Sequence, residues 1–406
     1  MNFIDGGVTA PKGYKASGIY AGIKKKRKDI ALVYSTVPAV GAGTFTTNVV
    51  KAAPVNWDMK LTRESEHIQA VIINSGIANA CTGEEGQKNN YLMAKAVADN
   101  LQIPVESVYT ASTGVIGKQL PIDLIIESVP KLAEELDDTK EAGTLAAQAI
   151  MTTDTYIKEC AVSFYISSKE VTLGGMAKGS GMIHPNMATL IGVLTTDLAI
   201  SKELLQEALS ENVKHTFNMI SVDRDTSTND SVFLLANGLA GNPVIKEKNE
   251  DYYTFCKALN MVMTKLAKML AADGEGATKL LEVTVKGALT WEDAASLSKS
   301  VISSNLVKTA IFGNDANWGR ILCALGYGGV EFNPDRVDLF IESEKGSLKL
   351  VENGIATGYS EETATDILSG KEVKVLVDLK QGPASATAWG CDLTYDYVKI
   401  NADYRS

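Results

Sequence analysis

One threonine stands out because of the residues around it. Segment 178–197, KGSGMIHPNMATLIGVLTTD, is a loop rich in glycine and proline that leads to Thr189 and then to the apolar run LIGVL, where we expect a buried strand to begin. A threonine hydroxyl is a weak nucleophile unless a base lies beside it. The α-amine of the same residue, with an unperturbed pKa of about 8, can be that base once the preceding peptide bond is cut.

Self-cleavage before Thr189 is chemically reasonable. The small Ala188 leaves room for the Thr189 hydroxyl to attack the Ala188 carbonyl, which would give an ester that water then hydrolyses. The residue type alone favours a simpler reading, because a threonine at the head of a strand is ordinarily a β-branched residue that packs. The residues permit the reaction without demanding it.

Other groups that could do chemistry are few. The three histidines, His67, His184 and His215, are scattered; His184 precedes Thr189 by five residues, and we expect it to have a structural role in the loop. Asp223 and Asp225, together with Asp230, could be taken for a metal cluster. We favour a structural loop and expect no metal ion, because the attack of a threonine hydroxyl on a carbonyl described above requires none.

Charge and composition narrow the function classes. The net charge of −10 and pI near 5.1 argue against nucleic-acid binding. The basic run 24–28 could be a polyanion patch, but it is short and without aromatic residues, so we expect a solvated turn between two strands. The glycine-rich pieces lack the spacing of phosphate-binding loops. Five widely separated cysteines without zinc-site spacing fit a reduced cytoplasm, and no export signal or membrane-spanning run is visible.

The elements that must position these groups follow an α/β pattern. Short β-like runs begin at positions 29, 67, 161 and 337, and they alternate with stretches of helical period at 90–101 and 122–136. Ser201 is the expected N-cap of a helix, a second helix is expected over 252–272, and a third from Trp318 after the turn and capping residues GNDAN. The length of 406 residues predicts two core-forming lobes.

The cleavage segment HPNMATLIGVLTTD closely resembles that of the ornithine acetyltransferase family, the glutamate N-acetyltransferases. Seven further motifs follow in family order along nearly the whole chain: NSGIANACTG from Asn74, STGVIG from Ser112, TTDT from Thr152, SVDRDTSTND from Ser221, DGEGATK from Asp273, GNDANWGR from Gly313 and NADYRS from Asn401. Two positions depart from the family pattern, Ile77 where Asn is commoner and Arg224 where Gly is commoner; both concern local loop geometry.

The resemblance implies a self-cleaving enzyme of arginine biosynthesis. Cleavage would give an α chain, 1–188, and a β chain, 189–406, typically assembled as an α2β2 heterotetramer. The implied fold is the two-lobed layered α/β fold shared with self-processing aminopeptidases. The substrates are small amino acids: an acetyl group would pass from N2-acetylornithine through acetyl-Thr189 to glutamate. No cofactor is implied, and acetyl-CoA as a second donor is left open.

The resemblance also assigns site residues. Thr189 would be the nucleophile, and Thr113 and Gly114 the oxyanion hole. Lys178 would hold a substrate carboxylate, and Glu275 suits the ornithine ammonium group, although it would repel the side chain of glutamate. The remaining substrate-binding positions would be Thr152, Asn401 and the terminal Ser406, which would require an ordered tail.

Two rival functions remain. An amidase or aminopeptidase-like hydrolase of the same fold would share the acyl-enzyme chemistry, with water in place of glutamate as the acceptor. A non-catalytic scaffold protein would stay uncleaved and would run as one band near 43.4 kDa on a denaturing gel.

Overall fold

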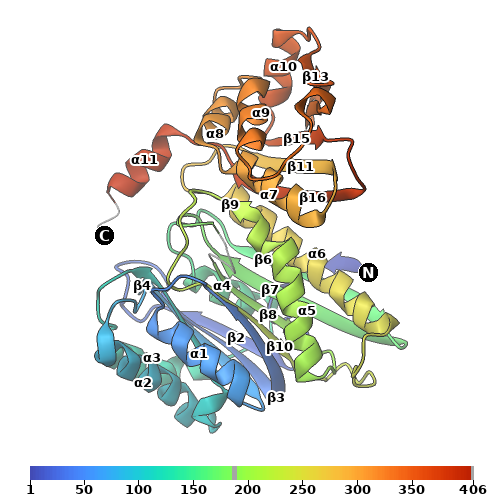
Figure 1. The fold of residues 1–406 in the computed structure, drawn as a ribbon. Helices are drawn as coiled ribbons and strands as arrows, with labels where there is room; N and C mark the ends of the chain where they lie inside the picture. Colours follow the sequence, from blue (N-terminus) through green and yellow to red (C-terminus); the bar gives the residue numbers. More distant parts are fainter. Residues whose placement is uncertain (185–189, 404–406) are drawn as a thin grey trace. The chain divides into compact units, whose positions relative to one another are not determined.

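The computed structural model describes residues 1–184 and 190–403 and divides them into two compact units. Unit 1 comprises 1–179, 185–218 and 226–266, and unit 2 comprises 180–184, 219–225 and 267–406. Both contain helices and strands, which confirms the α/β class and the expectation of two lobes (Figure 1). The units are distinct from the predicted α and β chains, because each contains residues from both sides of position 188.

The sheet of unit 1 has the strand order β1-β6-β7-β8-β10-β3-β4-β5, with β2 also paired to β3. The long strand β3 connects its two halves, since residues 30–35 of β3 pair with β2 and residues 40–45 pair with β10. The strands are β1 Asn2–Ile4, β2 Tyr14–Ile19, β3 Ile30–Phe45, β4 Ile68–Ile77, β5 Val108–Val115, β6 Lys158–Ile166, β7 Lys169–Lys178, β8 Ile191–Thr196 and β10 Ser231–Ala236.

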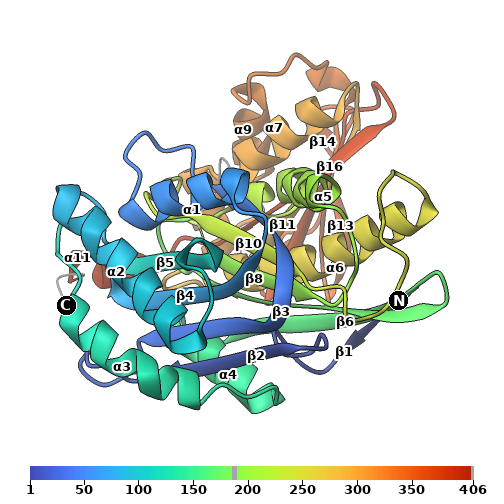
Figure 2. The same ribbon diagram turned by 90° about the horizontal axis from the view of Figure 1, so that it is seen from below.

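Helices cover the outer faces of this sheet (Figure 2). Helices α2 and α3 pack on the half made of β2, β3, β4 and β5. On the other half, α5 packs on β3 and β10, and Leu266 and Val262 of α6 lie against Gly175 of β7. The helices are α1 Ala53–Glu64, α2 Gly83–Leu101, α3 Ile122–Glu134, α4 Lys140–Ala149, α5 Lys202–His215 and α6 Glu250–Ala272, of which unit 1 includes residues up to 266.

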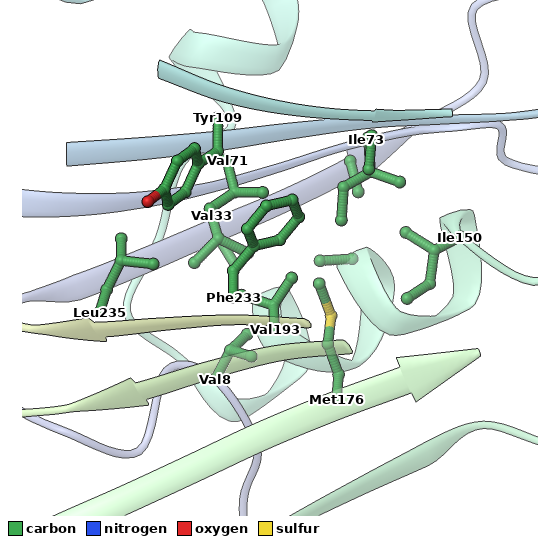
Figure 3. Packing of buried hydrophobic residues seen from close by; sticks show 14 of the residues in the cluster. Val8, Val33, Val71, Ile73, Tyr109, Ile150, Met176, Val193, Phe233 and Leu235 are labelled. Atoms are coloured by element: carbon green, nitrogen blue, oxygen red, sulfur yellow. The ribbon is translucent and has the colours of Figure 1, made fainter. Parts of the chain in front are cut away.

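The core of unit 1 lies between the two halves of the sheet (Figure 3). Alternate residues of β4 explain how one strand serves two layers: Val71 and Ile73 point into this core, whereas Ala70 and Ile72 face α2 and α3. Phe233 of β10 stacks on Tyr109 of β5 with ring centroids 4.8 Å apart, so strands from both halves meet in one apolar cluster.

Unit 2 is built on a seven-stranded sheet of order β14-β13-β12-β15-β11-β16-β9. Helix α7 packs on β11 and β16, and α10 packs on β12 and β13. The elements are β9 Ile220–Ser221, β11 Leu280–Ala288, α7 Trp291–Ile302, α8 Asn305–Phe312, α9 Trp318–Gly326, β12 Asp338–Ser343, β13 Gly346–Glu352, β14 Ile355–Ala356, α10 Glu361–Leu368, β15 Glu372–Asp378, β16 Ala384–Cys391 and α11 Tyr395–Ala402.

Most predicted elements are present. Ser201 caps α5, where its side chain accepts a hydrogen bond from the Leu204 N–H, and the helix expected over 252–272 is α6. The capping role expected of GNDAN is wrong in one respect: the Asn317 side chain does not cap α9 and instead donates to Asp315 at 3.1 Å. The turn itself is formed, with Asn314 at φ +55°.

Candidate active site

Thr189 and Ala188 lie outside the described residues, but the strands that precede and follow them in the sequence are described. Strands β7 and β8 are antiparallel neighbours, and Lys178 at the end of β7 pairs with Ile191 at the start of β8. All six residues of β8 are buried, as predicted for the run after Thr189. Thr189 is therefore two residues away from a strand position that is paired with Lys178.

Lys178 brings together three of the residues predicted for the site. Its side chain is buried, and its Nζ donates to the Thr152 hydroxyl at 2.8 Å and to the Thr113 hydroxyl at 3.3 Å. Thr152 follows α4, whereas Thr113 is near the end of β5, so the lysine connects segments that are far apart in sequence. This cluster contains a cation and two hydroxyl groups.

Gly114 must be glycine for a structural reason. Its φ is +131°, a region that residues with a side chain rarely adopt. A Cβ atom at Gly114 would lie 2.3 Å from the carbonyl carbon of Gly76, the residue paired with it on β4. The close approach of these two backbones fixes the Thr113-Gly114 peptide, which offers an N–H and a neighbouring hydroxyl as donors to an oxyanion.

Asp154 is hydrogen-bonded to residues of the Lys178, Thr113 and Thr152 cluster and beside it, and the sequence analysis assigned it no role. Its carboxylate accepts hydrogen bonds from Lys158 Nζ at 2.7 Å, from the Gly179 N–H at 2.7 Å and from the Thr152 N–H at 2.9 Å. Burial tends to raise the pKa of Asp154, but the positive charges of Lys178 and Lys158 outweigh it and hold that pKa well below its usual range. Asp154 is thus an anion that fixes both Thr152 and Gly179, the residue that follows β7.

The basic run is not simply a solvated turn. It connects β2 to β3 as expected, but Lys24 is half-buried and its Nζ donates to the Met151 carbonyl at 2.9 Å. Arg27 donates to the Thr152 carbonyl at 3.3 Å. Burial lowers the pKa of Lys24 to about 8. The loop therefore contacts the segment that contains a predicted binding residue.

In unit 2, Glu275 and Asn401 contact each other. Asn401, in α11, donates from Nδ2 to Glu275 Oε2 at 2.7 Å, and the Glu275 N–H donates to the Ser180 carbonyl at 2.9 Å. The Glu275 carboxylate also lies against Gly181, where an added Cβ would be 2.3 Å from it. Glu275 is buried, and the predicted ordered tail extends at least through α11. Ser406 lies outside the described residues.

Asp223 organises the loop that precedes the cleavage segment. Its carboxylate accepts hydrogen bonds from the backbone N–H groups of Met182 at 2.6 Å and Ile183 at 2.8 Å, as in a structural loop. The next residue, Arg224, has φ +72°, which explains why glycine suits this position in the family pattern. Residues 1–184 and 190–403 contain no group of three or more potential ligands that could hold a metal ion.

His184 is positioned by Ser221, with Nδ1 and Oγ 3.0 Å apart. Burial, together with the positive charges of Lys299 and Arg224, lowers the pKa of His184 to about 4. The ring is therefore neutral at neutral pH, which fits the structural role expected of it.

Comparison with known proteins identifies the family. The ArgJ family model matches residues 15–406. The chain belongs to the ArgJ family. It is 50% identical to the arginine biosynthesis bifunctional protein ArgJ of Caldanaerobacter subterraneus subsp. tengcongensis over 406 residues, 100% of both chains. It is also 50% identical to the ArgJ protein of Thermotoga neapolitana, over 98% of this chain and 99% of that protein.

Solved structures of ArgJ relatives were also found. A crystal structure of ornithine acetyltransferase complexed with ornithine from Mycobacterium tuberculosis is 40% identical, covers 46% of this chain and 99% of its own, and has a TM-score of 0.43. As an ArgJ protein, the chain is an acetyltransferase of arginine biosynthesis that acts on small molecules, as the motifs predicted. Across the described segments, no helix is long and apolar enough to span a membrane.

Proposed function

We propose that the chain cuts itself between Ala188 and Thr189 and then uses Thr189 to carry an acetyl group from N2-acetylornithine to glutamate. The observation that carries the proposal is the cluster of Lys178, Thr113 and Thr152, in which Lys178 is paired with Ile191, two residues after Thr189. Small amino acids bear carboxylates that a lysine can hold, and the acyl group needs oxyanion donors beside the nucleophile.

The transfer has two half-reactions. In the first, the Thr189 amine takes the proton of Oγ, and Oγ attacks the acetyl carbonyl of N2-acetylornithine. The C–N bond then breaks, the ornithine amine leaves with that proton, and an acetyl ester remains on Thr189. In the second, the glutamate amine attacks the ester, N-acetylglutamate leaves, and Oγ regains a proton.

Thr113 is suited to stabilise both tetrahedral intermediates. Its hydroxyl oxygen accepts a hydrogen bond from Lys178, so the hydroxyl proton is available to an oxyanion. The Gly114 N–H would be the second donor. The nearby ammonium group of Lys178 adds positive charge where negative charge develops and would bind the substrate α-carboxylate. In unit 2, the Glu275 carboxylate, held by Asn401, suits the ornithine ammonium group.

Three further properties belong to the same proposal. Acetyl-CoA serves as a second acetyl donor; the word bifunctional in the names of the ArgJ relatives supports this. The α and β chains assemble as an α2β2 heterotetramer, and the enzyme works in the cytoplasm without a metal or cofactor. An assay of glutamate acetylation with each donor supplied alone tests the first of these properties.

The decisive experiment combines mass spectrometry with Thr189 variants. The wild type should consist of two polypeptides of 188 and 218 residues (406 minus 188), and N2-acetylornithine alone should leave an acetyl group on Thr189. Thr189→Ala should stay uncleaved and inactive, because no hydroxyl can attack. Thr189→Ser should cleave and transfer more slowly, because the methyl group that restricts χ1 is lost. An active, full-length wild type or an acetyl group on another residue would refute the mechanism.

Added glutamate separates the transferase from the hydrolase. Glutamate should accelerate the steady-state release of ornithine, because it deacylates Thr189 faster than water does. Release at the same rate with and without glutamate would favour a hydrolase.

A further inference from the structure

The acceptor of the proposed reaction has two carboxylates, and Lys178 is suited to hold one of them. The amine of glutamate must reach the acetyl carbon, and its α-carboxylate is attached to the same carbon as that amine. The α-carboxylate is thus bound close to the oxyanion donors, where Lys178 Nζ lies 3.3 Å from the Thr113 hydroxyl. The side-chain carboxylate extends farther from the reacting amine and needs a second cation.

Lys24 is a second cation next to the same cluster. Its Nζ donates to the Met151 carbonyl, and the following residue, Thr152, accepts a hydrogen bond from Lys178. The stem of Lys24 also lies on Gly76, where an added Cβ would be 3.0 Å from Lys24 Cγ. Gly76 is in turn the close neighbour of Gly114. Two independent contacts therefore place Lys24 near the cluster. The first is with Met151, which precedes Thr152 in the sequence, and the second is with Gly76, which packs against Gly114 of the candidate oxyanion hole.

The charge of Lys24 is available to a ligand. Its hydrogen-bond partner is a neutral carbonyl, so the contact fixes the side chain without neutralising it. The neighbouring anion Asp29 accepts hydrogen bonds from the backbone N–H groups of Ala21, Gly22 and Lys24, which hold the loop in shape. Arg27 adds a further positive charge at the Thr152 carbonyl. The segment 151–152 is thus bordered by the side chains of Lys24, Arg27 and Lys178.

We propose that Lys24 determines acceptor specificity: its ammonium group pairs with the side-chain carboxylate of glutamate while Lys178 holds the α-carboxylate. This inference rests on the proposed transfer through Thr189. A neutral side chain such as that of glutamine cannot form this ion pair. Lys24 therefore favours glutamate over glutamine as the acetyl acceptor.

The test compares Lys24→Met with Lys26→Met, which removes an exposed charge from the same loop. Acetyl transfer is measured with glutamate and with glutamine, which keeps the α-carboxylate but has a neutral side chain. Lys24→Met should raise the KM for glutamate by about 10- to 100-fold, the effect expected on losing a charge-assisted hydrogen bond, with a smaller change in kcat. The preference for glutamate over glutamine should fall by a similar factor, and Lys26→Met should match the wild type.

The donor half-reaction is the internal control. The burst of ornithine released from N2-acetylornithine should be the same in Lys24→Met and in the wild type, which also shows that the variant folds. If it does not fold, Lys24→Gln retains a donor to the Met151 carbonyl and should show the same loss of preference. Lys24→Arg, which keeps the charge, should retain the preference for glutamate.

The outcomes distinguish this inference from the proposed function. Equal losses with glutamate and glutamine, or a matching rise in the KM for N2-acetylornithine, would overturn the role of Lys24 alone. A rise confined to the KM for acetyl-CoA would assign the charge to that donor and would also overturn it. A wild type that releases no ornithine from N2-acetylornithine would refute the proposed function, and this inference with it.

Discussion

The Thr113 hydroxyl can accept one hydrogen bond while it donates another, and this dual capacity matters at the scale of a single residue. Because Lys178 occupies an acceptor position, the hydroxyl proton is left for the substrate oxygen. The Thr152 hydroxyl also accepts a hydrogen bond from Lys178, but Thr152 is in addition held through its backbone N–H by Asp154. Thr152 is therefore better suited to positioning and Thr113 to chemistry.

Replacing Thr113 by alanine should affect the rate more than binding. The lost donor would stabilise the oxyanion mainly in the transition state, so we expect kcat to fall by roughly 100- to 1,000-fold with little change in KM. Thr113→Ser retains the hydroxyl and should lose much less, which makes it the matched control. Steady-state kinetics with N2-acetylornithine and glutamate measure both variants. A raised KM with unchanged kcat in Thr113→Ala would remove Thr113 from the oxyanion hole.

At the scale of elements, the adjacent ends of β4 and β5 create the geometry that Thr113 needs. Gly76 and Gly114 both have positive φ, and their backbones approach so closely that no side chain fits at Gly114. The strand pairing shifts register just after this pair, at Ile77, which is one of the two positions where the chain departs from the family pattern. The Asn74 side chain donates to the Ile77 carbonyl at 2.9 Å and so holds the irregular end of β4 in place.

Gly114→Ala should destabilise the protein and abolish transfer. The strained φ and the clash with Gly76 together should cost about 2–4 kcal/mol in the free energy of unfolding. Gly117→Ala is the matched control, because Gly117 also has positive φ but nothing lies within 4 Å of an added Cβ. It should cost only about 1 kcal/mol and leave transfer intact. Denaturant unfolding and an activity assay compare the two variants. Equal losses in the free energy of unfolding would show that the close approach of Gly114 to Gly76 is unimportant.

The sequence predicts a structural feature well when the residues that determine it are neighbours in the chain, and poorly when the fold brings distant residues together. The capping of α5 by Ser201 and the buried strand after Thr189 follow from neighbouring residues, and both predictions are confirmed. The contact of Lys24 with Met151 joins residues 127 positions apart, so the basic run could only be read as a turn. Asp154 had a visible signal, its place inside the TTDT motif, but its role depends on Gly179 and Lys158, which the fold brings to it.

At the scale of the whole molecule, the predicted cleavage point and the compact units follow different boundaries. Unit 1 combines residues from both predicted chains, because β8 and β10 belong to 189–406 while their neighbours β7 and β3 belong to 1–188. Unit 2 does the same, since Val222 donates its N–H to the carbonyl of Ile183. Each unit thus combines residues from both sides of the predicted cleavage point.

Cleavage should therefore leave the two chains bound to each other. Strand β8 lies between β7 and β10, and the core packs Val193 and Phe233 of the predicted β chain with Val33 and Tyr109 of the predicted α chain. Separating the chains would break two strand pairings and expose this core, which amounts to unfolding unit 1. We expect both chains to elute together in size-exclusion chromatography of the native protein and to separate only in denaturant. An α2β2 assembly would elute at about twice the 43.4 kDa of one cleaved copy, whereas separate elution of the chains without denaturant would contradict the pairing of β7 with β8 after cleavage.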